Sequence, residues 1–141
     1  MRDGEFQKIQ ESDETMYGPK GILVCGYPPP EHRFFALFMD KAGLSDRPII
    51  FPTNEDAGKT LSELFSLTTG SGMGEPADLP RAVILSGFTQ NELHRIMYAY
   101  RQAGLPAQLW ATLTPVSENW LLADLLKELL KENEILKEKK K

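Results

Sequence analysis

Apolar and polar residues follow the same order twice along this chain. Two continuously apolar runs, Gly21–Gly26 and Ala82–Gly87, each end in glycine and are typical of strands buried on both faces of a sheet. Each run is followed by a segment with apolar residues at helical spacing. In the second half these residues are Leu93, Ile96, Met97, Tyr100 and Ala103. The pattern predicts a strand and then a helix in each half.

Boundary residues support both helices. Thr89 and Glu92 have the spacing of a capping box, and prolines 28–30 of the first half favour a first helical turn. Gly43 and Gly104 suit the position just after a helix. Second strands are predicted at Pro48–Thr53 and Gln108–Thr114, and second helices within Asn54–Leu67 and Pro115–Leu136.

The two halves also align residue by residue. A shift of 61 positions places Lys20–Phe65 over Arg81–Leu126 without a gap, which indicates one supersecondary unit used twice. Since strand–helix–strand crossovers are right-handed, we expect an α/β fold in which two tandem βαβα repeats form a mainly parallel, four-stranded sheet. Helices would cover both faces, around a pseudo-twofold axis. With the first strand of each repeat at the centre, the strand order is 2-1-3-4, with a switch-point crevice between Gly26 and Gly87.

These patterns divide the chain into segments. The predicted repeats occupy residues 19–67 and 81–136. Residues 1–18 are acidic and poor in large apolar side chains, so we expect a disordered tail. Residues 68–80 are rich in Gly, Ser and Pro, which is typical of a flexible connector, and residues 137–141 form a lysine-rich end.

Composition narrows the classes of function. The net charge of −4 disfavours a nucleic-acid partner. No apolar stretch approaches the roughly 18 residues of a membrane span, and the start of the chain has no apolar signal-peptide core. The single cysteine, Cys25, lies in an apolar run and excludes an internal disulfide. We therefore expect a cytoplasmic protein, with no cofactor, no metal and no membrane partner.

The predicted site lies along a shared edge formed by the C-terminal ends of the strands, where a small molecule or a protein partner would bind. Candidate binding residues are Tyr27, Glu31, Phe88, Glu92, Thr114, Asn119 and Trp120. The favoured function is a non-enzymatic binding or interaction module. The alternative is a small enzyme that uses Glu31 and Glu92, or a carboxylate with His32 or His94. Against that alternative, the two glutamates suit the first turn of a helix, and both histidines are predicted to lie on the surface.

A second surface is predicted from a difference between the halves. Phe34, Leu37 and Phe38 are apolar, whereas polar or smaller residues stand 61 positions later. The last helix carries a leucine stripe that includes Leu125 and Leu129. We expect this helix to pack on its own sheet, and the alternative is an adaptor that forms a homodimer through these five residues.

The second half contains Ser86-Gly87-Phe88, Leu113-Thr114-Pro115 and Asn119-Trp120, followed by a leucine-rich helix. With these motifs it resembles a short bacterial domain family of unknown function. The resemblance runs from Pro80 to about Glu132, and the first half looks like a diverged copy. The resemblance implies a domain boundary and no activity.

Overall fold

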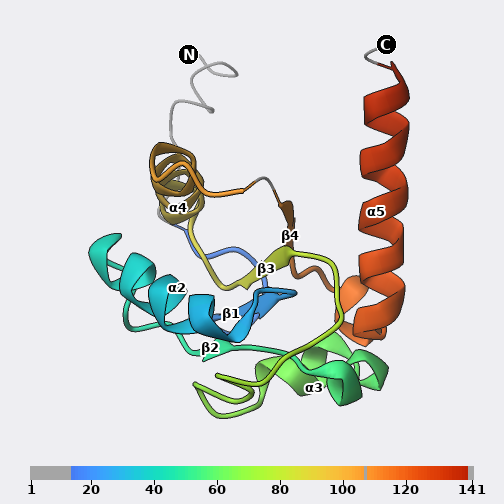
Figure 1. The fold of residues 1–141 in the computed structure, drawn as a ribbon, viewed down its shortest axis with the longest axis horizontal. Coiled ribbons are helices and arrows are strands. Elements are labelled where there is room, and N and C mark those ends of the chain that lie inside the picture. The colour runs from blue at the N-terminus through green and yellow to red at the C-terminus, as the bar shows by residue number, and fades with distance from the viewer. Residues whose placement is uncertain (1–13, 107, 140–141) are drawn as a thin grey trace.

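The computed structural model describes residues 14–106 and 108–139 and forms an α/β fold with one four-stranded sheet (Figure 1). Residues 1–13 of the expected tail and residues 140–141 lie outside the described residues. In chain order the elements are β1 (Gly21–Cys25), α2 (Pro29–Lys41), β2 (Ile49–Ile50), a 3-10 helix (Asn54–Gly58), α3 (Leu61–Phe65), β3 (Ala82–Ser86), α4 (Gln90–Gln102), β4 (Leu109–Thr112), a second 3-10 helix (Ser117–Asn119) and α5 (Leu122–Lys139).

The strand order β2-β1-β3-β4 agrees with the prediction, but the relative direction of the two central strands does not. β1 is parallel to β2 and β3 is parallel to β4, whereas β1 and β3 are antiparallel, with Leu23 opposite Ile84 at their centre. The sheet is therefore mixed, and the prediction of a mainly parallel sheet is wrong. A crossover helix fixes the direction of strands only within its own half, and a central strand is buried on both faces in either direction.

The antiparallel central pair separates the C-terminal ends of the strands. Gly21 lies opposite Ser86 and Cys25 lies opposite Ala82, so β1 and β3 end on opposite sides of the sheet. The single C-terminal edge and its crevice, both expected from the sequence, are therefore absent from the described structure.

Helices cover both faces of the sheet, as expected. Successive side chains of a strand point to opposite faces, so β1 and β3 contribute to two cores. Ile22 and Val83 pack with α2 and α4, whereas Leu23 and Ile84 pack with α3 and α5 (Figure 1). None of the helices formed by the described residues is both long and apolar enough to cross a membrane.

Helix boundaries follow the predicted caps closely. Thr89 and Glu92 form the capping box of α4, and Gly43 and Gly104 have φ angles of +78° and +69° just after α2 and α4. Each predicted second helix is divided into a 3-10 helix and a following α-helix. In the first half, Thr60 starts α3 with a capping box of its own. The second strands are also shorter than predicted.

The connector 68–80 follows the outer edge of β2. The Gly70 amide donates to the Ile49 carbonyl at 2.7 Å, and the Phe51 amide donates to the Ser71 carbonyl at 2.8 Å. The Ile49 amide donates to Thr69 Oγ1 at 3.0 Å. The connector thus occupies the hydrogen-bonding positions beside β2, at one end of the strand order.

Residues 14–18, which we expected in the acidic tail, contact the turn between β3 and α4. The Met16 amide donates to the Phe88 carbonyl at 2.8 Å, and the Gly87 amide donates to the Tyr17 carbonyl at 3.2 Å. These bonds tie the start of the described chain to the end of β3.

Candidate functional site

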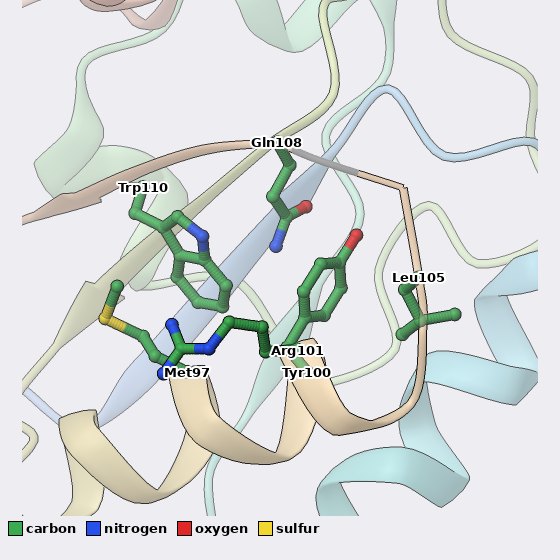
Figure 2. Close-up of a pocket in the computed structure, with 6 residues that line it drawn as sticks. All are labelled: Met97, Tyr100, Arg101, Leu105, Gln108 and Trp110. Atoms are coloured by element: carbon green, nitrogen blue, oxygen red, sulfur yellow. The ribbon is translucent and has the colours of Figure 1, made fainter.

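A hollow of about 310 Å³ opens between α4 and the start of β4 (Figure 2). Its lining residues are Met97, Tyr100, Arg101, Leu105, Gln108 and Trp110. The rings of Tyr100 and Trp110 meet edge to face, with centroids 5.4 Å apart, which is a favourable aromatic geometry. The volume is at the lower end of the range of roughly 300–1,000 Å³ that small ligands occupy.

Gln108 supplies the polar end of this hollow. Its Oε1 accepts a hydrogen bond from the Tyr27 hydroxyl at 2.6 Å. Its Nε2 is buried and has no hydrogen-bond partner in the described parts of the chain. Figure 2 shows this nitrogen directed toward the space between Trp110 and Tyr100. A buried donor left without a partner costs about 1–3 kcal/mol, which an acceptor oxygen on a ligand would recover.

Two tyrosines hold the amide of Gln108 in place. The Tyr100 hydroxyl donates to the Pro106 carbonyl at 2.5 Å and lies 3.3 Å from the Tyr27 hydroxyl. Burial raises the pKa of Tyr27 above its usual value, so its hydroxyl stays protonated. Tyr27, a predicted site residue, thus lies behind the hollow and orients Gln108.

A second hollow, of about 260 Å³, continues along the same face of β4. It is lined by Leu85, Leu93, Met97, Trp110, Ala111 and Thr112. Because Met97 and Trp110 line both hollows, the two form one depression, which we call the α4–β4 groove. Arg101 is the one charged residue among the ten that line it.

The two candidate glutamates lie at opposite ends of the sheet. Glu31 pairs with Arg81 at 3.1 Å, and the guanidinium of Arg81 lies over the Tyr27 ring, 4.3 Å from its centroid. At the other end, Glu92 pairs with Arg47, whose guanidinium lies 5.2 Å from the centroid of the Phe88 ring. The structure therefore does not bring these two carboxylates together around one substrate.

The surroundings of Glu92 favour its charged form. Burial alone would raise the pKa of this carboxyl, but hydrogen bonds from Arg47 and from the Thr89 amide outweigh burial and lower the pKa. Glu92 thus combines a helix cap with an ion pair, which agrees with the interpretation of a first-turn acid.

The remaining candidate binding residues lie away from the groove. Thr114 exchanges hydrogen bonds with Ser117, at 2.9 and 3.0 Å, in the turn that precedes α5. Asn119 and Trp120 are exposed beside a hollow formed with the first turns of α5.

The five candidate interface residues divide into two groups. Phe38 and Leu125 are buried within the protein's own cores, and Leu129 packs against the second core. Phe34 and Leu37 are 50% and 54% exposed on α2. These two side chains are therefore the members of the set that lie open to a partner.

His32 is buried, so the prediction that it lies on the surface is wrong. Its Nδ1 accepts from the Gly74 amide at 2.8 Å, and its ring stacks on Phe51 with centroids 4.3 Å apart. Because an amide donates to Nδ1, the proton is on Nε2, which donates to the Tyr27 carbonyl at 3.0 Å. His94 is exposed. Among the described residues, no cluster of three or more His, Cys, Asp or Glu side chains could hold a metal ion.

Sequence reasoning missed Gln108, Trp110 and Met97 as site residues. A signal for Gln108 was present, because the shift of 61 positions places it at the counterpart of Arg47. An amide in place of a buried guanidinium marks a position where the halves differ in polar chemistry.

Residues 81–136 match the model of a family described as a domain of unknown function (DUF3783). The match agrees with the resemblance of the second half and contains β3, α4, β4 and α5 up to residue 136. All ten residues that line the α4–β4 groove lie within it. No curated protein and no solved structure matches the chain.

Proposed function

We propose that this protein is a binding module whose ligand occupies the α4–β4 groove. The observation that carries this proposal is the buried, unpartnered Nε2 of Gln108 beside the aromatic walls of the larger hollow. A fitting ligand places an acceptor oxygen at Gln108 and an apolar group against Trp110 and Met97. This arrangement recognises a ligand and needs no nucleophile or base.

The test uses the methyl group of Met97 as a reporter in the full chain. We expect that small aromatic carboxylates, added to protein with labelled methionine methyl groups, shift the NMR signal of Met97. Gln108→Glu keeps an acceptor for the Tyr27 hydroxyl but removes the donor, so affinity should fall about tenfold, which corresponds to roughly 1.4 kcal/mol. Trp120→Phe, in the hollow beside α5, should leave affinity unchanged. Compounds that shift only the other methionines, or none, would refute the proposal.

We also propose that the two halves are diverged copies of one unit. Leu23 faces Ile84 in the sheet and Thr60 forms a bridge with Leu121, and both pairs are 61 positions apart. This pairing of equivalent residues is what a twofold axis through the sheet requires. Only the second half would bind a ligand, because the position of Gln108 is taken in the first half by Arg47, which forms a buried ion pair with Glu92.

A second candidate function is self-association through the outer face of α2 and α4. It is favoured by a hollow of about 430 Å³ lined by Phe38, Ala42, Tyr98 and Ala99 among others, next to the exposed Phe34 and Leu37. The apolar face would be covered in a homodimer. Its test, the solution mass of the protein, is given in the Discussion.

A further inference from the structure

We propose that the occupant of the α4–β4 groove is an extended segment of a partner protein, which adds to the sheet as a further strand beside β4. This inference rests on the proposed function and names the class of ligand. It depends on three properties of the groove: an open backbone edge, two hollows that adjoin one face of β4, and a lining that has positive but no negative side chains.

The backbone of β4 is open along its outer edge. The Leu109 amide donates to the Arg81 carbonyl at 3.2 Å, and the Leu113 amide donates to the Leu85 carbonyl at 2.9 Å. Alternate residues of a parallel strand face the same neighbour, so Trp110 and Thr112 direct their amides and carbonyls away from β3. Within the described residues, β3 is the one strand beside β4. The outward groups are therefore placed to bond an added strand.

β4 lacks the features by which edge strands avoid such pairing. Residues 109–112 contain no proline and no charged side chain, and all four are partly exposed. The other edge of the sheet differs, because the connector 68–80 occupies the bonding positions beside β2. Strand addition is thus blocked at β2 and open at β4.

The groove offers places for the side chains of the added strand. Trp110 and Thr112 lie on the groove face of β4, and two hollows of about 310 and 260 Å³ adjoin this face, with Trp110 and Met97 lining both. Side chains on one face of a strand repeat every second residue, about 7 Å apart. Apolar side chains at alternate positions of an added strand would face these hollows, as in peptides that bind by strand addition.

Charge defines the end of the segment that meets Gln108. Arg101 of α4 and Gln108 Nε2 are donors that line the larger hollow, with the Arg101 guanidinium beside Met97 in Figure 2, and none of the ten groove residues is Asp or Glu. In a protein with a net charge of −4, this is a local site for an anion. The fitting segment carries apolar residues at alternate positions and a terminal carboxylate within reach of Arg101 in the larger hollow.

The experiment uses short synthetic peptides that alternate valine with threonine and end in aspartate or asparagine. They are added to the full-length chain, and binding is followed through the Met97 methyl signal and amide hydrogen exchange. We expect exchange of the Trp110 and Thr112 amides to slow about tenfold, while that of Leu113, already bonded to β3, stays unchanged. The aspartate peptide should bind more tightly than the asparagine peptide, and Arg101→Gln should remove that preference.

N-methylated peptides separate backbone pairing from side-chain binding. Methylation of the peptide amides that face β4 should abolish binding, and methylation of the intervening amides should not.

Equal binding of both forms, or binding of small carboxylates alone, would overturn strand addition and leave the proposed function standing. If neither peptides nor small carboxylates shift Met97, both proposals fail. Protection of Trp110 and Thr112 that rises with protein concentration alone would overturn the proposal in favour of a second copy of the chain.

Discussion

Arg47 and Gln108, which the shift of 61 positions aligns, have different surroundings. Arg47 is 5% exposed, pairs with Glu92 and Asp46, and lies over the Phe88 ring. Gln108 receives one hydrogen bond, from Tyr27, and keeps a buried donor for a ligand. Arg47 Nε is also a buried donor without a partner among the described residues, but the Arg47 guanidinium is held in an ion pair, whereas Gln108 Nε2 lies beside a hollow.

Removal of the Arg47 guanidinium should destabilise the fold strongly. Arg47→Met leaves the Glu92 carboxylate half-buried without its main partner, and breaking a buried pair from one side costs about 3–5 kcal/mol. The matched control is Lys59→Met, since Lys59 pairs with Asp56 at the surface and its loss should cost less than about 1 kcal/mol. Both are measured as the free energy of unfolding in denaturant. Equal losses in the two variants would contradict the assigned role of Arg47.

The lowered pKa of Glu92 predicts how stability depends on pH. Since the folded-state pKa lies below the usual value of a glutamate carboxyl, the charged carboxylate stabilises the fold above that usual value, and the stabilisation is lost as pH falls through the folded pKa. Wild type should therefore exceed Glu92→Gln in unfolding free energy near neutral pH, and the difference should shrink in acid. The lowered pKa of Asp56, which pairs with Lys59 and not with Arg47, is common to both proteins and cancels in the comparison. A difference that does not change with pH would exclude the charged pair as its source.

Local sequence patterns predicted where strands and helices form better than they predicted the relative direction of the strands. The apolar runs predicted β1 and β3, and the Thr89–Glu92 spacing predicted the start of α4, because strand burial and capping depend on nearby residues. The relative direction of β1 and β3 is set by how the halves pack, which no local pattern records. The direction of the central strands matters most for the candidate site. Tyr27 does not line the groove but donates to Gln108, which does. Glu31 and Phe88 were assigned to an edge that exists only if the central strands are parallel.

The connector predicts a contrast between two of its glycines. At Gly72, φ is +80° and an added Cβ would lie 1.9 Å from the Phe51 carbonyl oxygen; at Gly74, φ is +86° with nothing within 4 Å. Gly74→Ala should lower the free energy of unfolding by only about 1–2 kcal/mol, which is the strain of alanine in a left-handed backbone conformation. Gly72→Ala must also displace the connector from β2, so we expect a loss above about 3 kcal/mol. Thermal or denaturant unfolding measures both, and similar losses would show that the connector does not need its close approach to β2.

The molecule has a second exposed apolar surface, on α2 and α4, which is separate from the α4–β4 groove. Phe34 and Leu37 project from α2, and Tyr98 is exposed on α4. This face and the α4–β4 groove share α4 but use different sides of it, so self-association and ligand binding can be measured separately.

If the second candidate function is correct, the solution mass of the full chain should fall from dimer to monomer on dilution. Phe34→Ser combined with Leu37→Ser should give a monomer throughout, because the substitutions remove the apolar area that the partner covers. Ile135→Ser, a comparably exposed apolar position on α5, should leave the mass unchanged. A monomer at all concentrations of the wild type would exclude this function.

The contacts of the connector with β2 also decide how far sheets of this protein can polymerise. A molecule with two open edges could add copies at both sides without end, and the product would be a fibre. Here the bonds from Gly70, Phe51 and Ile49 close one edge, so each molecule has a single point of growth in its described part. Two copies that met at β4 would each use their open edge, so edge-to-edge growth of the sheet would end at a pair. By covering the edge of β2, the connector thus protects the protein from aggregation into fibres.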